Sequence, residues 1–395
     1  MNILILNSDS PNNMGDAAIL FGNVSLIRKV WPNAEITAIS EFPNRDQKIF
    51  GIDFIKSKVY TINPYSIIKI AVLSKSYDLV LWGGGELLKD YTNILGNVYW
   101  FLRILSVRIF NKKIAGAFQG IGETNSVISR FFIRRAVSCC QTFAVRDNES
   151  YKKLVSWGVS TKLINSYDPA IMCADELGNE ASKVDTGGAV VGIGARNWFH
   201  YRQGGIIPYK FRNFGFQKQA SKENARYVER LSLVLDMIIE KYDVDILFFP
   251  MFNSLKEGDD SFSFVIKSRM RHASRVRVVN KEGMSPVEYL RCMSHLKAFI
   301  GVRLHSAILA ACSRIPFSIL YYSDKGRVFS EQMGMGSYAM SLNEFTQVQD
   351  MEKMLDAIGV MMNEKERIGF SIDRKISEIK TSIEKDFRDM VSYIK

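Results

Sequence analysis

The chain has 395 residues, of which 47% are hydrophobic and 24% charged, with a net charge of +11 and an isoelectric point near 9.3. This length suits two domains better than one core, and the composition excludes disordered and fibrous proteins. The positive charge favours acidic or phosphorylated partners and leaves open a peripheral contact with an anionic membrane. Because no known nucleic-acid-binding motif accompanies the charge, we expect no nucleic-acid partner.

Hydropathy and cysteine usage indicate where the protein works. No apolar run approaches the roughly 18 residues of a membrane span, and Arg103 and Arg108 interrupt the most apolar stretch, 94–109. The apolar start, Ile3–Leu6, is too short for a signal sequence. The five cysteines are an odd number without a C-x-x-C pair, so we expect buried thiols and no metal site. These features predict a cytoplasmic protein, with the membrane contact left open.

Short β-rich runs alternate with helical patterns along the first half of the chain. Strands are expected at 2–6, 36–40, 58–62, 78–82, 114–118 and 142–145. Helices are expected at 17–30, 94–110, 127–137 and 148–156. Residues 176–188 lose this periodicity and are expected to link two domains.

The same rhythm restarts after the linker. Strands are expected at 190–193, 245–249, 276–279, 298–302 and 317–321. Helices are expected near 222–241, 262–272, 286–294 and 303–312, with a helical tail from about 343. The segment 201–227 interleaves aromatic and basic residues and is either a functional lid or a self-packed insertion.

This pattern predicts an α/β protein with two doubly wound, Rossmann-like domains facing a cleft, which is a GT-B-like architecture. The first domain is expected over 1–180, the second over 181–345, and a helical tail over 346–395.

The most informative motif is Arg303-Leu304-His305, which lies between a predicted strand and a helix rich in small residues. Ligands of open α/β sheets bind at such strand ends, and a helix N-terminus favours anions. Arginine offers a planar donor fork, and histidine can move a proton near neutral pH. The alternative is an arginine that caps a loop beside a structural histidine.

Glycine-rich turns follow three predicted strands of the first domain. Asn13, Gly15 and Asp16 close the first turn, where Asp16 either caps the helix or faces the cleft. The run Gly83, Gly84 and Gly85 allows the backbone to approach a ligand closely, and Gln119 and Gly120 occupy the equivalent position after the next strand.

Three further residues follow strands of the second domain or lie near them. Arg196 is expected to point into the cleft beside Arg303 as a second anion ligand. Asp260 belongs to an acidic pair that either caps a helix or binds hydroxyl groups, and Lys325 follows the last strand.

Taken in order, these segments resemble the polysaccharide pyruvyltransferase family over about residues 2 to 335. The matching motifs are Asn13-Met-Gly-Asp16, Gly83-Gly-Gly85, Gln119-Gly-Ile-Gly122, Val145-Arg-Asp147, Asp168-Pro-Ala170, Gly192 to Arg196, Asp259-Asp260, Arg303-Leu-His305, and Pro316 to Tyr322 with Lys325. The chain departs from the family pattern at Ala17, where an acidic residue is frequent, and at Glu123, where proline is frequent.

The resemblance implies a transferase that moves pyruvate from phosphoenolpyruvate, the donor, onto sugar hydroxyls of an exopolysaccharide or cell-surface polysaccharide, as a ketal. It implies a donor site in the second domain at Arg196 and Arg303, His305 as acid or base, Asp16 as a second candidate, and no cofactor or metal. The acceptor is expected to be a saccharide, with a lipid-pyrophosphate carrier left open. The alternatives are a nucleotide-sugar glycosyltransferase of the GT-B class and a non-catalytic module that binds glycans or nucleotides.

Overall fold

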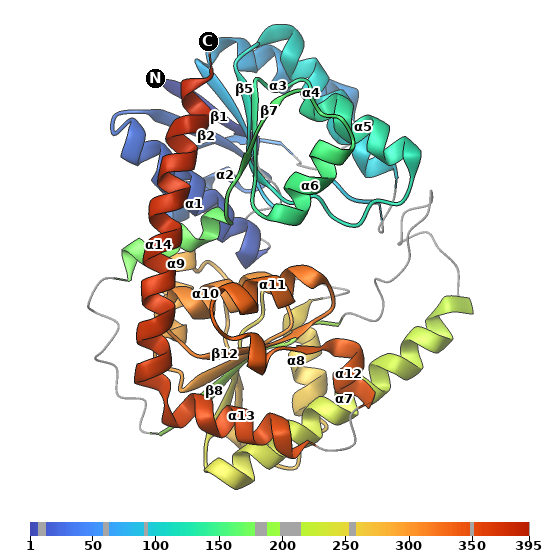
Figure 1. The fold of residues 1–395 in the computed structure, drawn as a ribbon, viewed down its shortest axis with the longest axis vertical. Helices are drawn as coiled ribbons and strands as arrows, with labels where there is room; N and C mark the ends of the chain where they lie inside the picture. The colour runs from blue at the N-terminus through green and yellow to red at the C-terminus, as the bar shows by residue number, and fades with distance from the viewer. Residues whose placement is uncertain are drawn as a thin grey trace.

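The computed structural model describes residues 1–6, 13–57, 63–90, 94–177, 188–197, 215–252, 258–347 and 351–394. Within them, two parallel sheets lie one above the other, each covered by helices, as Figure 1 shows. The predicted α/β class with two doubly wound domains is confirmed. No helix in these ranges combines the length and the apolarity of a bilayer-spanning segment.

The first sheet has seven strands in the order β3-β2-β1-β4-β5-β6-β7, all of them parallel. Its central strands are continuous apolar runs that are buried on both faces, which is typical of parallel sheets covered by helices. The strands are β1 (Asn2–Leu6), β2 (Glu35–Ser40), β3 (Asp53–Lys56), β4 (Leu79–Gly83), β5 (Ile114–Gln119), β6 (Thr142–Val145) and β7 (Lys162–Asn165).

Helices cover both faces of this sheet. Buried side chains of α1 (Met14–Val30) and α2 (Pro43–Phe50) join one hydrophobic core. Those of α3 (Pro64–Leu73), α4 (Leu95–Phe110), α5 (Val127–Val137) and α6 (Asn148–Ser156) join a second core on the other face.

The second sheet has six strands in the order β10-β9-β8-β11-β12-β13. They are β8 (Val190–Gly194), β9 (Asp245–Phe248), β10 (Val276–Val278), β11 (Ala298–Gly301), β12 (Phe317–Tyr321) and β13 (Met340–Ser341). Its helices are α7 (Gly215–Tyr242), α8 (Asp259–Lys267), α9 (Pro286–Met293), α10 (Leu304–Cys312), α11 (Asp324–Gln332) and α12 (Leu342–Gln347). A short 3-10 segment, η2 (Pro169–Glu176), ends the first half.

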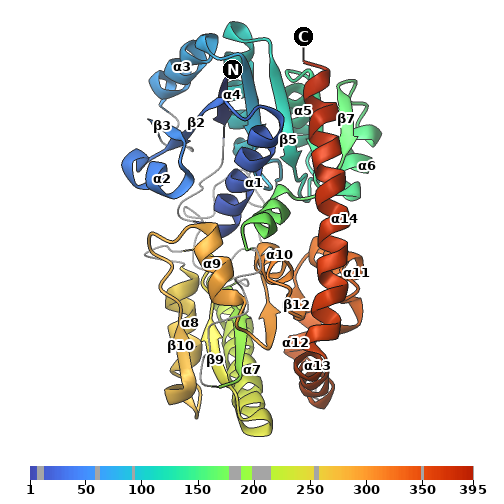
Figure 2. The ribbon, with the colours of Figure 1, turned by 90° about the vertical axis from the view of Figure 1, so that its left-hand side faces the viewer.

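The last helix returns to the first sheet. After α13 (Glu352–Asn363), the long α14 (Lys365–Ser392) runs along both halves of the molecule, as Figure 2 shows. It contacts β6, β7 and α10, and Phe387 is fully buried against Phe118 and Trp31. This helix therefore ties the two halves together.

Several expectations need adjustment. The expected strand 58–62, most of the linker and residues 201–214 of the expected lid lie outside the described residues. The strand seen near the first of these is β3 (Asp53–Lys56), and residues 215–227 form the start of α7, so this part of the segment is helical and no loop. The helix expected at 262–272 is α8 (Asp259–Lys267), which begins earlier because Asp259 and Asp260 form its first turn.

The strand order of each sheet reverses once, between β1 and β4 in the first and between β8 and β11 in the second. Ligands of doubly wound sheets bind outside the carboxyl ends of the strands at this reversal. The carboxyl edges of the two sheets meet, because Met14, after β1, donates its backbone N–H to the carbonyl of Met251, after β9, at 2.8 Å, and Asn13 pairs with Phe252 across the junction. The fold thus brings both expected ligand positions to one place.

Candidate functional site

The N-terminus of α1 forms one wall of the junction. Asn13 caps this helix, because its Oδ1 accepts from the backbone N–H of Gly15 at 3.0 Å. The same amide group donates to Oδ2 of Asp16 at 2.9 Å, which fixes the carboxylate in the first turn. The expectation that Asp16 itself caps the helix is therefore wrong: Asn13 is the N-cap, and Asp16 lies in the first turn, half-buried at the junction.

His305 reaches this wall from the second domain. It lies in the first turn of α10, directly after Arg303 at the N-cap and Leu304. A Cβ atom on Gly15 would lie 2.7 Å from Cγ and Nδ1 of the imidazole, so only glycine leaves room for the ring. The sequence motifs around Gly15 and His305, which are 290 positions apart, therefore form one contact.

Two residues of the first domain hold the other side of the imidazole. Nε2 of His305 lies 3.3 Å from Oδ2 of Asp168 and 3.3 Å from Nη1 of Arg146. Arg146 follows β6 and donates to Asp168 at 2.7 Å, and both side chains are buried. Oδ1 of Asp168 also accepts from the backbone N–H of Ala170. A histidine held by a carboxylate in this way has a fixed ring orientation.

The charges in this cluster stabilise each other. Burial acts to raise the pKa of Asp168, but Arg146 and His305 outweigh it, so this pKa lies well below its usual range. Burial acts to lower the pKa of Arg146, but Asp168, Glu86 and Asp147 outweigh it and the pKa is raised. Asp168 is therefore a carboxylate and Arg146 a cation throughout the physiological range.

Lys325 makes a second ionic contact between the domains. Its Nζ lies 2.9 Å from Oε2 of Glu86 and 3.6 Å from Oδ2 of Asp147, both in the first domain. Burial acts to raise the pKa of Glu86, but Lys325, Lys89 and Arg146 outweigh it and lower the pKa. Glu86 also lies 3.9 Å from Arg146. Lys325, which was predicted from its place after β12, is therefore linked through Glu86 to the His305 cluster, which consists of His305, Arg146 and Asp168.

Arg303 is held by an acidic partner within its own domain. Its Nε and Nη2 donate to the two oxygens of Asp259 at 2.8 and 2.9 Å, and its guanidinium lies 5.9 Å from the ring centroid of Phe252. Asp259 is buried and also accepts from the backbone N–H groups of Met251 and Phe252. The pair thus fixes the direction of Arg303. Asp260, the predicted neighbour, lies in the same first turn of α8.

A buried lysine adjoins this pair. Lys281 is 5% exposed, and its pKa is lowered to about 8. Burial is the main cause, and the positive charge of Arg303 adds to it against the attraction of Asp259 and Asp260. A bound anion would raise this pKa again.

Arg196 follows β8 as Arg303 follows β11. Because Gly194 pairs with Gly301, the two arginines stand at neighbouring positions beyond adjacent strands. Nη1 of Arg196 donates to the hydroxyl group of Tyr322, and its guanidinium lies 5.0 Å from the centroid of that ring. The two arginines predicted as anion ligands therefore share one edge of the second sheet.

The glycine turns after β4 and β5 lie next to each other in the first domain's part of the site. Gly84 and Gly85 have φ of +96° and +71°, which favours glycine, and the carbonyl of Gly85 accepts from Gly120 at 2.9 Å. A Cβ atom on Gly120 would lie 2.7 Å from Nε of Arg146, so this glycine lets the guanidinium pack on the backbone.

Gly83 and Gln119 lie one layer deeper. Gly83 packs against Asn23 and Ile5, and the fully buried Gln119 donates to the carbonyl of Trp82 at 2.8 Å. The preceding Phe118 has φ of +54°, and the pairing of β5 with β6 shifts register here. Such irregularities redirect side chains next to functional sites. The side chain of Gln119 thus connects the strand ends that precede the two glycine turns.

Glu86, Arg146, Asp147 and Asp168 were not among the predicted site residues. In the sequence, Arg146 and Asp147 indicate a charged helix start, and Asp147 indeed caps α6. Asp168 indicates an ordered junction, and it does cap η2. The signal that could have identified them is their common position after β4, β6 and β7, at the same sheet edge as the glycine turns.

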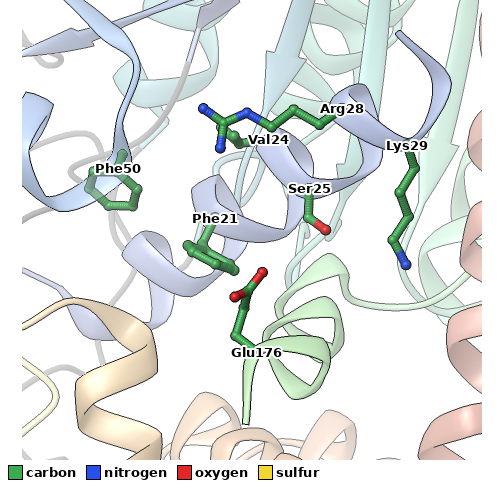
Figure 3. Close-up of a pocket in the computed structure, with 7 residues that line it drawn as sticks. All are labelled: Phe21, Val24, Ser25, Arg28, Lys29, Phe50 and Glu176. Atoms are coloured by element: carbon green, nitrogen blue, oxygen red, sulfur yellow. The ribbon is translucent and has the colours of Figure 1, made fainter. Parts of the chain in front are cut away.

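A separate pocket of about 250 Å³ opens between α1, α2 and η2, as Figure 3 shows. It is lined by Phe21, Val24, Ser25, Arg28, Lys29, Phe50 and Glu176. None of the predicted site residues lines it, so it does not belong to the His305 cluster. Among the residues that the structure describes, no group of three His, Cys, Asp or Glu side chains could hold a metal ion.

A comparison with protein families gives a match over most of the chain. A family model described as "Polysaccharide pyruvyl transferase" matches residues 13–324, which include every predicted site residue except Lys325. No curated protein matches the chain.

Solved structures show the fold. UDP-GlcNAc 2-epimerase from Neisseria meningitidis, bound to UDP-GlcNAc, is 12% identical with a TM-score of 0.63, covering 100% of this chain and 99% of that one. A glycosyltransferase from Rickettsia africae is 10% identical with a TM-score of 0.58, covering 100% and 98%. At such identities the likeness establishes a shared fold, and the predicted GT-B-like architecture is confirmed.

Proposed function

The chain belongs to the polysaccharide pyruvyl transferase family, and we propose that it moves pyruvate from phosphoenolpyruvate onto sugar hydroxyls as a ketal during the synthesis of an exopolysaccharide or cell-surface polysaccharide. The observation that supports this most is the contact of His305 with Arg146 and Asp168 across the domain junction, two residues after Arg303. No cofactor or metal enters the proposed reaction.

Phosphoenolpyruvate carries a carboxylate and a phosphate, which require two separate cationic ligands. Arg196 and Arg303 lie at neighbouring positions on one sheet edge and carry the two cationic groups that such a donor requires. Asp259 orients Arg303, and Tyr322 orients Arg196. Lys281, whose pKa is lowered to about 8, adjoins this place, and a bound anion would raise that pKa and hold the lysine in its protonated form.

The proposed chemistry begins with a proton. Nε2 of His305 faces Asp168, so the ring's other nitrogen, Nδ1, lies on the side of Gly15 and the α1 N-terminus. His305 delivers a proton to the methylene carbon of the donor, which makes the adjacent carbon electrophilic. A sugar hydroxyl attacks that carbon and gives its proton to a base, for which Asp16 is the second candidate.

The ketal forms in a second step. The bond from the same carbon to the phosphate oxygen breaks, and a second hydroxyl of the sugar attacks that carbon and gives its proton to the departing phosphate. The products are the ketal and inorganic phosphate, so atoms and charge balance without an oxidant or reductant. The proposed acceptor is a saccharide, and a lipid-pyrophosphate carrier fits the same scheme.

The test is phosphate release from phosphoenolpyruvate that depends on an acceptor. The purified protein would be incubated with phosphoenolpyruvate and the lipid-linked saccharide fraction of its host, followed by mass spectrometry. We expect acceptor-dependent phosphate release and a product heavier by about 70 Da, the increment of a pyruvate ketal.

The alternatives give other results. Transfer from UDP-sugars or GDP-sugars without use of phosphoenolpyruvate would identify a glycosyltransferase. Binding of saccharide or nucleotide without turnover of either donor would identify a non-catalytic module. The variant His305→Gln tests the site in the same assay. Its matched control is His272→Gln, which changes a histidine on the surface of the second domain that pairs with Glu240.

A further inference from the structure

The outer face of the first domain, formed by α3, α4 and α5, exposes an unusual number of large apolar side chains. Eleven of the twenty that are exposed in the described residues belong to these three helices. Examples are Ile68 and Val72 on α3, Leu102 and Ile109 on α4, and Val127 and Phe131 on α5. Scattered exposed apolar residues are normal, but a contiguous group indicates an interaction site.

The exposed residues form one surface. α3 packs beside α4, and α4 packs beside α5, on the side of the sheet opposite α1. In Figure 1 the three helices lie at the top and right of the first domain, away from α14. We call this surface the α3–α5 face.

The charge of the α3–α5 face has a single sign. Segments 64–76, 95–113 and 127–138 contain nine Lys and Arg residues and no Asp or Glu. All of them except the buried Arg103 are exposed or half-exposed, including Lys69, Lys112, Arg134 and Arg135. In contrast, the long surface helix α14 has seven basic and six acidic residues. The exposed charges of these three segments are therefore all positive.

We propose that the α3–α5 face docks onto the surface of an anionic lipid bilayer. Apolar side chains at the tips of such a face enter the boundary between headgroups and acyl chains, and lysines and arginines around them attract anionic headgroups. A second copy of this chain fits the face less well, because two identical faces without a single acidic residue would repel each other.

The face adjoins the candidate site. α4 follows the loop that contains Gly84, Gly85 and Glu86, and α5 follows the loop that contains Gly120. Exposed residues near the starts of these helices, Leu95 and Val127, are thus on the side of the domain where the strands end. Docking would hold the site close to the headgroups, where a lipid-linked saccharide is displayed, and this last step alone rests on the proposed function.

The test uses the full chain and sedimentation with vesicles of phosphatidylcholine, with and without phosphatidylglycerol. Leu105→Glu with Ile109→Glu removes exposed apolar contacts, and Arg134→Glu with Arg135→Glu reverses exposed charges. The matched control is Phe370→Glu with Arg374→Glu on α14, which are also exposed.

We expect the unaltered chain to bind the anionic vesicles, and both face variants to partition at least about tenfold more weakly, with the control unchanged. Absence of binding by the unaltered chain, or equal binding by all variants, would overturn the proposal. A dimer that only the Leu105→Glu/Ile109→Glu variant dissociates, without any lipid effect, would assign the face to a second copy instead. These readouts involve no turnover, so they do not depend on the transferase assay.

Discussion

At the scale of single residues, the two arginines of the second sheet edge carry the proposed donor site. Arg303→Ala and Arg196→Ala should each weaken binding of phosphoenolpyruvate roughly 10-fold to 150-fold, because each removes a charge-assisted contact of about 1.5–3 kcal/mol. Arg303→Lys should restore little, since lysine lacks the planar fork that Asp259 holds. Isothermal titration calorimetry measures these affinities.

The controls for this prediction address folding and specificity. Arg277→Ala changes an exposed arginine of β10 and should leave donor affinity intact. Since Arg303→Ala leaves the buried Asp259 without its partner, the double variant Arg303→Ala/Asp259→Asn separates lost binding from lost stability. Donor affinity that is unchanged in both single variants would remove the arginines from the site.

Lys281 should make stability depend on alkaline pH. Its pKa is lowered to about 8 in the folded chain, mainly by burial, whereas an unfolded lysine titrates near its ordinary value of 10.5. The folded state therefore binds fewer protons between these values, and the penalty of a buried cation is relieved as pH rises through 8. We expect the free energy of unfolding of the native chain to gain about 2 kcal/mol between pH 7 and pH 9.5 relative to Lys281→Met.

Urea unfolding at both pH values measures this difference. Lys353→Met, which changes an exposed lysine of α13, should show the same pH dependence as the native chain. Parallel pH curves for Lys281→Met and the native chain would show that Lys281 keeps an ordinary pKa.

At the scale of elements, the start of α1 and the start of α10 have to fit each other. Gly15→Ala should lower turnover by about 100-fold, because the new methyl group would lie 2.7 Å from the imidazole that Asp168 and Arg146 hold in place. Gly188→Ala is the matched control, since no atom lies within 4 Å of its added Cβ. Steady-state kinetics would contradict the fit if both glycine variants kept full turnover.

Most elements could be predicted from the sequence because their signals are local. The buried strands are apolar runs, and the predicted bounds of β1, β6, α5 and α6 are those observed. β7 and β13 were not predicted, because they are short and only partly buried at sheet edges. α2 was not predicted either, although Pro43 at its start and Gly51 in a left-handed conformation after its end are readable signals.

The candidate site could be predicted only in part. Motifs at strand ends identified Arg303, His305 and the glycine turns, because an anion site requires those residue types there. Arg146 and Asp168 could not be assigned to His305 from sequence, since only the fold brings residues 159 and 137 positions away to one imidazole. Their local roles at helix starts concealed this second contact.

At the scale of the whole molecule, buried ion pairs join the two domains. The pKa of Asp168 is lowered because Arg146 and His305 outweigh its burial, so its contribution to stability is complete above the unfolded pKa near 4 and is lost as pH falls below it. Asp168→Asn should cost about 3 kcal/mol at pH 6, and the difference from the native chain should shrink towards pH 3.

Asp356→Asn, which changes an exposed partner of Lys241, is the control for this acid dependence and should cost little. A constant difference between the native chain and Asp168→Asn from pH 6 to pH 3 would contradict the ionised pair. Chemical unfolding monitored by circular dichroism gives both quantities.

The central claim is that His305, held at the junction by residues of the other domain, moves the proton in pyruvyl transfer. The most direct measurement compares acceptor-dependent phosphate release and phosphoenolpyruvate affinity for the native chain, His305→Gln and the control His272→Gln. We expect His305→Gln to lose about 10²- to 10⁴-fold in turnover, with donor affinity changed much less and His272→Gln fully active. Near-full turnover by His305→Gln would contradict the claim and make His305 a structural residue.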